Sequence, residues 1–334
     1  MGLYKWKKDK KRRLQLNLLT ITTLLILIII LLVVNGRINT ENLKDPGCVK
    51  ALNCTVVITI DYGEELVLTQ QIQSNDSLSA FDALCRVATV GSNGGFVNSI
   101  NNVTSTYSIF NEESKDWFYY INGVLSPVGS QAYMVHDGDV IHWDYHTWVD
   151  YKSSTVIIGD YPEPFLHGFN GKRPGSFIVY TSDFIDEAEE VRETLLSLYS
   201  VNSSLIPVNS LNNEVKTRGN LILIGTLDDH PLIKSIMDSS SMLGLFIRYK
   251  DNGIEILDEL YRSTGYFDHG GCIIALQNHW NPKGSVHGEN IIWIITGVTS
   301  SDVEKACDLL CYKADVIRYA NSVVVIDDEV MRVP

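Results

Sequence analysis

Basic residues are scarce in most of this 334-residue chain. Residues 1–17 hold seven of its 27 lysines and arginines but only one of its 40 acidic residues, so the remainder has 39 acids against 20 bases and a net charge of −19. Nucleic acids and anionic lipid surfaces are bound by basic patches. The composition therefore argues against both as partners and predicts a soluble, self-repelling surface.

Charge is also absent between Leu18 and Val34, where only three threonines are polar. At about 1.5 Å per residue, a helix of this length nearly crosses a hydrocarbon core of roughly 30 Å. The basic residues directly before it are expected to stay in the cytoplasm. No small-x-small cleavage site follows, which favours an uncleaved anchor over a cleaved secretory signal. We expect a cytoplasmic tip at 1–17, one transmembrane helix at 18–34, and an extracellular remainder.

Signatures of catalysis are lacking as well. The loop from Gly159 to Gly175 does not have the spacing of a phosphate-binding loop and leads into a strand rather than a helix. His269 precedes Cys272 by three residues, but a histidine so close to a thiol on one turn rarely activates it as a nucleophile. There are no paired carboxylates, no nucleophile elbow and no complete metal-ligand set. We expect a non-enzymatic protein without a cofactor.

Two domains are predicted after a polar, turn-rich stalk at residues 35–53. In the first domain, residues 54–150, two strand-like segments precede a helical segment that begins after Asn75-Asp76-Ser77. Three more strands are expected around residues 96–100, 117–121 and 140–145. This order is typical of a β-grasp-like α+β domain, in which one helix crosses a mixed sheet.

The residues of this domain also carry a resemblance. Trp117 to Val124 (WFYYINGV) and Asp137 to Tyr145 (DGDVIHWDY) resemble the signature of the DUF4430 family. That family is a β-grasp-like module resembling the C-terminal domain of transcobalamin and intrinsic factor, and the resemblance covers roughly residues 54–150. In the vertebrate transporters the domain closes over cobalamin, which makes cobalamin a ligand by family analogy only.

The second domain, residues 151–334, is predicted to be α/β. Its apolar runs at 221–225 and 291–296 are typical of buried strands, and helices are expected after Asp183 and after Ser300 or Ser301. On residues 220–226, 278–282 and 295–297, this half resembles an α/β domain of archaeal S-layer-type surface proteins and the periplasmic domains of the bacterial cellulose synthase regulatory subunit. The resemblance implies a non-catalytic domain at the surface of a cell, with an archaeal source favoured.

One strand carries candidate metal ligands. His142, Asp144 and His146 follow each other at two-residue spacing and so share one strand face. Imidazole and carboxylate groups in this arrangement would suit zinc or a similar divalent ion. The alternative is a polar, solvent-facing side of a terminal strand. The aromatic ladder on the opposite face is most simply part of the core.

Two sets of residues are candidate ligand contacts. The first hypothesis is a protein that binds a small molecule or glycan at the cell envelope. Its contacts would come from the aromatic residues of the first domain or from the His279–Pro282 loop, near the end of a buried strand, where ligands of α/β sheets tend to bind. These candidates are Trp117, Tyr119, Trp143, Tyr145, Trp280 and Asn281. The alternative is a structural or interaction protein of the envelope or S-layer that holds protein partners.

All six cysteines follow the predicted membrane helix, and an oxidising exterior favours disulfides. Cys54 with Cys85 would join a first strand to the following helix. Cys272 would reach either Cys307 or Cys311, and Cys48 is left without an assigned partner. Reactive thiols are the alternative.

Four Asn-x-Ser/Thr triplets lie on the same predicted extracellular side. Their asparagines, Asn53, Asn75, Asn102 and Asn202, are candidate glycosylation sites.

Overall fold

The computed structural model describes residues 51–106, 114–149, 154–284 and 288–334. Residues Ala51–Pro334 form one compact unit, and the predicted domain boundary at residue 150 falls inside it. The predicted cytoplasmic tip, transmembrane helix and stalk lie outside the described residues, except for the end of the stalk. Within the described ranges, no helix is both long and apolar enough to cross a membrane.

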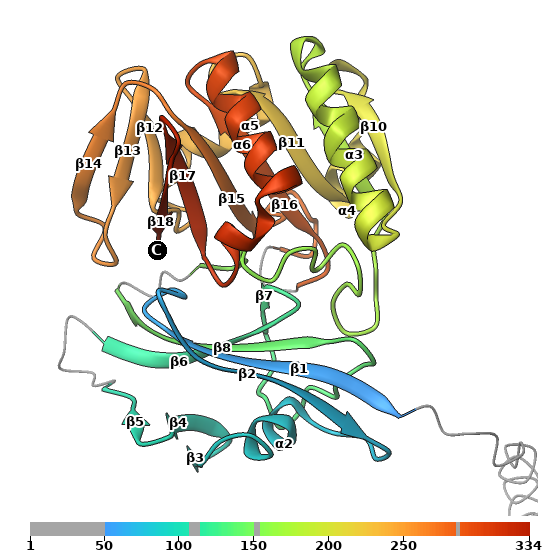
Figure 1. Ribbon diagram of the computed structural model, residues 1–334, viewed down its shortest axis with the longest axis vertical. Helices are drawn as coiled ribbons and strands as arrows, with labels where there is room; N and C mark the ends of the chain where they lie inside the picture. The colour runs from blue at the N-terminus through green and yellow to red at the C-terminus, as the bar shows by residue number, and fades with distance from the viewer. Residues whose placement is uncertain (1–50, 107–113, 150–153, 285–287) are drawn as a thin grey trace, which may run out of the picture. The chain divides into compact units, whose positions relative to one another are not determined.

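The first sheet has five strands and contains both parallel and antiparallel pairs (Figure 1). In spatial order these are β2 (Glu65–Ser74), β1 (Leu52–Ile60), β8 (Val140–Trp148), β6 (Ser114–Ile121) and β7 (Val124–Leu125). The central strands β1 and β8 are parallel, while β2 and β6 run antiparallel to them. The predicted mixed α+β organisation is confirmed.

One short helix and a small sheet accompany this five-stranded sheet. Helix α2 (Ala80–Cys85) begins at Ser79, which forms a capping box with Asp82. The helix is shorter than the apolar pattern predicts. The chain after it forms a separate antiparallel sheet of β3 (Val90–Asn93), β4 (Phe96–Ile100) and β5 (Val103–Thr104).

The second sheet has seven strands. In spatial order they are β10 (Ser203–Pro207), β9 (Ser176–Tyr180), β11 (Asn220–Thr226), β16 (Ile291–Gly297), β15 (Gly271–Gln277), β17 (Ser322–Ile326) and β18 (Glu329–Val333). The first four are parallel, and the other three pair antiparallel. This sheet matches the α/β layout predicted for the second half.

Both faces of the second sheet are covered, which explains its continuous apolar runs. Helices α3 (Ile185–Tyr199) and α6 (Ser300–Tyr312) pack with Ile222 and Ile224 of β11. On the opposite face lie α5 (Pro231–Asp238) and a sheet of β12 (Ile247–Lys250), β13 (Gly253–Leu257) and β14 (Ser263–Phe267). Helix α4 (Asn213–Arg218) connects β10 to β11.

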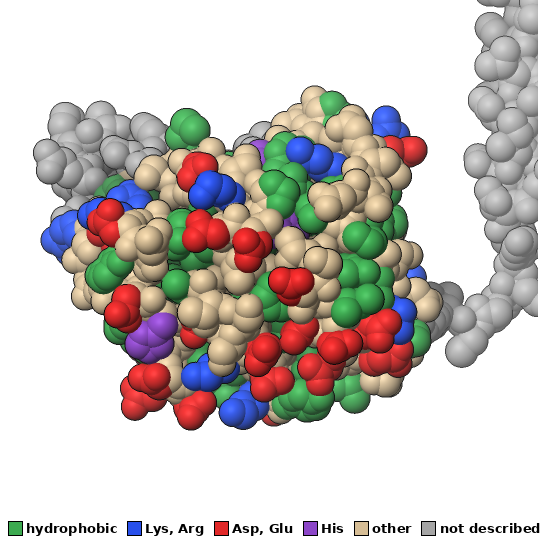
Figure 2. All heavy atoms as spheres, turned by 90° about the horizontal axis from the view of Figure 1, so that it is seen from above, with side chains coloured by type: hydrophobic (Ala, Val, Ile, Leu, Met, Phe, Trp, Pro, Cys, Tyr) green, Lys and Arg blue, Asp and Glu red, His purple; other side chains and the backbone are tan. Residues whose placement is uncertain are grey.

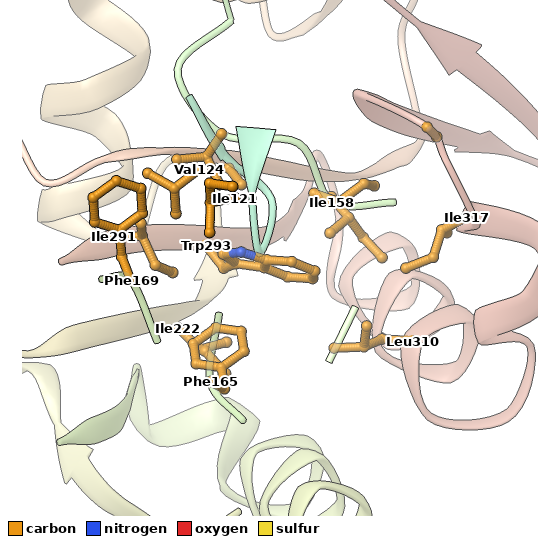
Figure 3. Packing of buried hydrophobic residues seen from close by; sticks show 14 of the residues in the cluster. Ile121, Val124, Ile158, Phe165, Phe169, Ile222, Ile291, Trp293, Leu310 and Ile317 are labelled. Atoms are coloured by element: carbon orange, nitrogen blue, oxygen red, sulfur yellow. The ribbon is translucent and has the colours of Figure 1, made fainter. Parts of the chain in front are cut away.

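The hydrophobic core is continuous between the two large sheets. Trp293 of β16 is fully buried, and its ring lies 5.4 Å from that of Phe165 and 5.7 Å from that of Tyr161. Ile121 and Val124, from the first sheet, belong to the same cluster (Figure 3). The two large sheets are therefore packed around shared apolar side chains.

The described cysteines do not form the predicted disulfides. The five described cysteines are free thiols, so none of the predicted pairs among them is formed. Cys272 packs on the α5 face of the second sheet, whereas Cys307 and Cys311 pack on the α6 face, and the sheet separates them. Cys54 is buried and Cys85 is exposed. Cys48 lies outside the described residues.

Two glycines allow a close approach to the segment before β17. A Cβ atom on Gly63, whose φ is +84°, would lie 1.8 Å from the carbonyl oxygen of Tyr319. A Cβ atom on Gly159 would lie 2.2 Å from the carbonyl carbon of Tyr319. Gly159 also exchanges backbone hydrogen bonds with this segment, donating to Ala320 and accepting from Tyr319. Side chains at 63 and 159 would force the backbone apart.

We expect Gly159→Ala to lower the free energy of unfolding by at least about 1–3 kcal/mol, the usual cost of inserting an atom into a packed site. Urea unfolding of the purified protein measures this. Gly129→Ala is the matched control, because no atom lies within 4 Å of its added Cβ. Equal stabilities for the two variants would contradict the proposed close packing.

Candidate functional site

A network of buried polar side chains covers one face of β8. His142, Asp144 and His146 are 1%, 3% and 0% exposed. The predicted alternative, a solvent-facing side of a terminal strand, is therefore wrong. β8 lies between β1 and β6, and side chains from outside the five-stranded sheet, such as Asp160 and Tyr319, contact this face.

His142 lies between a carboxylate and a hydroxyl group. Its Nδ1 is 2.8 Å from Oδ1 of Asp160, and its Nε2 is 2.8 Å from Oγ1 of Thr59. The Thr59 hydroxyl donates its proton to Asp144 at 2.5 Å, so it accepts a hydrogen bond from His142. Burial alone would lower the pKa of His142, but the charge and hydrogen bond of Asp160, with the charge of Asp144, raise it above 6.5. These contacts therefore favour the protonated form of His142.

Asp144 accepts hydrogen bonds from the turn between β1 and β2. The backbone N–H groups of Tyr62 and Gly63 donate to its two oxygens at 3.0 and 3.1 Å, and His146 Nδ1 donates at 2.6 Å. Burial alone would raise the pKa of Asp144. The hydrogen bonds from His146 and Thr59, with the nearby positive charge of His142, hold it below 3.8.

The ring of His146 lies between two aromatic rings. Its centroid is 4.1 Å from that of Tyr62 and 4.2 Å from that of Phe118, with stacked geometry on both sides. Its Nε2 atom is buried and has no hydrogen-bond partner among the described residues. The ring is held by stacking and by Asp144.

This network resembles a hydrolase triad in composition only. Asp160, His142 and Thr59 stand in the order acid, base and hydroxyl. However, Thr59 is fully buried, and its hydroxyl donates to Asp144 rather than to His142. In this arrangement the Thr59 hydroxyl is not accessible as a nucleophile.

The three candidate metal ligands are engaged in the same network. In the described ranges, no group of three His, Cys, Asp or Glu side chains is arranged to hold a metal ion. His142 bonds to Asp160 and Thr59, and His146 bonds to Asp144. The shared strand face predicted from the spacing is present, but its groups bond to one another and to neighbouring elements.

The predicted aromatic contacts lie on the opposite face of the sheet. The rings of Tyr119 and Trp143 stack at 4.9 Å, and those of Trp117 and Tyr145 lie 5.1 Å apart. Trp117 Nε1 donates to the backbone carbonyl of Val103, and the hydroxyl of Tyr145 donates to the backbone carbonyl of Thr104. Tyr119 is half-buried and the other three are buried. The ladder packs as core against β5, as the simpler interpretation predicts.

Trp280 and Asn281 form a packed loop. The ammonium group of Lys216 lies 4.3 Å from the centroid of the half-buried Trp280 ring, and the His279 ring lies 4.3 Å away. The Asn281 side chain is buried and donates to Asn290 at 2.8 Å. Since Lys216 covers one face of the indole, that face is not open for stacking on a sugar.

A surface pocket of about 250 Å³ was not predicted from the sequence. It lies beside the turn between β1 and β2, and its lining comes from chain segments that are far apart in the sequence. The lining residues are Asp61, Tyr62, Glu64, Lys115, Thr147, Glu259, Val333 and Pro334. No local motif joins these residues, so a single sequence carries no signal for the pocket.

The four sequon asparagines are all exposed. The side-chain amide of Asn53 donates to the carbonyl of Ala51 and to Asp137. Asn75 directly follows β2, and Asn102 lies in the turn between β4 and β5. Glycosylation at these sites stays a prediction.

A known family model matches the part of the chain that contains β6, most of β8 and the turns at Asn122-Gly123 and Asp137-Gly138. Residues 77–147 match the model of a domain of unknown function, DUF4430. This DUF4430 segment begins before α2 and includes most of β8, with His142, Asp144 and His146, whereas β1 and β2 precede it. The match supports the resemblance inferred from the sequence. The comparisons do not confirm a likeness to transcobalamin or to S-layer-type proteins.

No curated protein matches the chain. Among solved structures, a chain described as a "putative metal binding protein from Ruminococcus gnavus ATCC 29149" is 13% identical and aligns with a TM-score of 0.22. The alignment covers 28% of this chain and 95% of that chain. At this TM-score the likeness carries no weight for fold or function.

The network predicts opposite pH dependences for two variants. The stability contributed by the His142 charge is fully present below pH 6.5 and is lost as the pH rises through its raised pKa. The stability contributed by the Asp144 charge is fully present above pH 3.8 and is lost as the pH falls through its lowered pKa. The destabilisation by His142→Gln should therefore shrink at high pH, and that by Asp144→Asn should shrink at low pH.

Urea unfolding over a pH series measures both differences. His269→Gln is the control, because this histidine is exposed and its substitution should cost little at any pH. A pH-independent destabilisation by His142→Gln would show that its charge contributes nothing to the network.

Proposed function

We propose that this chain is a non-enzymatic, membrane-anchored protein of the cell surface that binds a small polar molecule or a glycan unit in the 250 Å³ pocket. The observation that carries the proposal is the pocket itself. Its walls come from the β1–β2 turn, from β6 and β8, and from Glu259 and the end of β18, so it exists only in the folded unit.

The chemistry of the lining favours a ligand rich in hydrogen-bond donors. Asp61, Glu64 and Glu259 supply carboxylates, and Lys115 is engaged with Asp61 at 2.9 Å. Hydroxyl groups of a sugar or an ammonium group would donate to such acceptors. Pockets for drug-sized ligands measure about 300–1,000 Å³, so this one suits a monosaccharide or a small amine, and not a molecule as large as cobalamin.

The non-enzymatic part of the proposal is supported by the buried network. In its Asp160–His142–Thr59 arrangement, the Thr59 hydroxyl donates to Asp144 rather than to His142, and the Thr59 side chain is fully buried. The tyrosine nearest to the pocket, Tyr62, donates its hydroxyl proton to the Thr147 carbonyl, and burial raises its pKa far above 10. It therefore stays a neutral hydrogen-bonding group.

The surface location rests on sequence and charge. The basic tip and the uncharged segment at 18–34 predict an anchor with the folded unit outside. Acidic side chains gather along one margin of the face in Figure 2, in keeping with the acidic excess of the residues after 17. The exposed sequons fit the same side of a membrane.

Binding is tested by native mass spectrometry on the protein isolated from its own host membrane. We expect a retained small molecule that is released on denaturation. Glu259→Gln should weaken its retention about tenfold or more, because a hydrogen bond to a charged group contributes about 1.5–3 kcal/mol. Glu193→Gln, an exposed residue of α3, is the matched control. A native mass equal to that of the protein alone would rule out binding in this pocket. So would an equal loss of the retained molecule in both variants.

Anchoring is tested by fractionating host cells that express the full chain or a chain without residues 1–34. The full chain should sediment with membranes and resist alkaline carbonate extraction, and the shortened chain should not. An external protease should cut the predicted polar stalk and release residues 51–334 from intact cells. Protection from the protease would contradict the predicted orientation.

A further inference from the structure

β2 is a ten-residue strand with one unpaired edge. It lies at the end of the five-stranded sheet and pairs with β1 alone. Long edge strands are sites where another chain adds, and natural proteins usually blunt them with lysine, proline or bulges. β2 contains neither lysine nor proline, and Leu66 to Ser74 carry no charge. Its register shift lies near Leu66, which leaves the pairing of Leu68 to Ser74 regular.

Backbone hydrogen bonds of β1 show which groups of β2 face the free edge. Thr55 of β1 donates its N–H to Asp139 on the β8 side, so the even-numbered residues of β1 face β2. The β2 residues opposite those even-numbered positions are Leu68, Gln70, Ile72 and Ser74. The N–H and C=O groups of the alternate residues Thr69, Gln71 and Gln73 therefore point away from the sheet.

These outward groups are largely unused. The carbonyl of Gln73 accepts a long hydrogen bond of 3.4 Å from Arg86. The Thr69 hydroxyl contacts the hydroxyl of Tyr319 at 3.0 Å, which leaves its backbone free. Among the described residues, no other hydrogen bond reaches the outward backbone of Thr69, Gln71 or Gln73.

We propose that this edge is a homodimer interface, in which β2 of a second copy adds antiparallel to β2 of the first. Charge is what favours this edge over the rest of the surface. The chain after residue 17 carries a net charge of −19, which disfavours contact between most of its surfaces. The edge from Leu66 to Ser74 is the exception, because it is uncharged and offers unpaired backbone groups.

A two-fold axis at Gln70 gives a self-complementary register. Each Thr69 then faces Gln71 of the other copy, and the two pairs exchange four backbone hydrogen bonds. Leu68 faces Ile72, and the regular ladder ends there, because the register shift of β2 lies between Leu66 and Leu68. The ladder from Leu68 to Ile72 is uncharged, and the acidic residues Glu64 and Asp76 lie outside it.

The interface is tested by disulfide trapping in the full chain, reconstituted in nanodiscs and in detergent. Gln70→Cys is placed in a Cys48→Ser, Cys85→Ser background, which removes the exposed thiol and the one outside the described residues. In the proposed register the two thiols introduced at position 70 belong to a non-hydrogen-bonded pair, with Cα atoms about 4.5 Å apart, close enough for a disulfide. We expect a covalent dimer on mild oxidation, and none for the control Ser197→Cys on α3.

A second variant separates pairing through β2 from pairing elsewhere. Gln71→Pro removes an outward N–H that β1 does not use, so the monomer should keep its circular dichroism spectrum. Its dimer dissociation constant, from analytical ultracentrifugation, should rise at least about tenfold. A monomeric wild type, a dimer unaffected by Gln71→Pro, or trapping of a different protein by the Gln70→Cys variant would each overturn the homodimer. These outcomes are independent of ligand binding in the pocket.

Discussion

The described unit depends on a buried histidine, His142, that bonds to the carboxylate of Asp160 and, through the hydroxyl of Thr59, to that of Asp144. His142 is on β8 of the first sheet, and Asp160 lies in the segment that leads to the second sheet. Isolated charges are costly to bury, and removing one partner from a buried pair costs about 3–5 kcal/mol. The pair therefore holds residues 154–175 against the first sheet. This segment includes Phe165, which packs on Trp293.

The same network positions the wall of the proposed binding pocket. Tyr62 donates its N–H to Asp144, stacks on His146 and donates its hydroxyl proton to the carbonyl of Thr147. These three contacts hold the β1–β2 turn, which supplies Asp61, Tyr62 and Glu64 to the pocket. A ligand bound there would contact a rigid wall, which lowers the entropy lost on binding.

The local patterns were sufficient for the most apolar strands and for β8, and insufficient for the surroundings of these strands. The apolar runs at 221–226 and 291–297 are fully buried strands, and the alternation along β8 separates its aromatic face from its polar face as predicted. The burial of the polar face was not predictable, because Asp160 and Tyr319 reach it from distant parts of the chain.

The cysteines show the same limit. The alternation of side chains along β15 places Cys272 on one face of the second sheet. No local pattern predicts on which face α6, with Cys307 and Cys311, packs. The pocket lining is likewise gathered from residues between 61 and 334. The aromatic candidates were chosen for ring chemistry, and three of the four are core residues since α2 and the sheet of β3, β4 and β5 adjoin them.

The two large sheets should unfold as one unit across the His142–Asp160 contact. Native-state hydrogen exchange measures this most directly, by comparing the opening free energies of the Val57 and Ile141 amides in the first sheet with those of Ile222 and Ile294 in the second. We predict equal opening free energies, lowered together by Asp160→Asn. Exchange of the first sheet through a separate, lower-energy opening, with the second sheet still protected, would contradict the account.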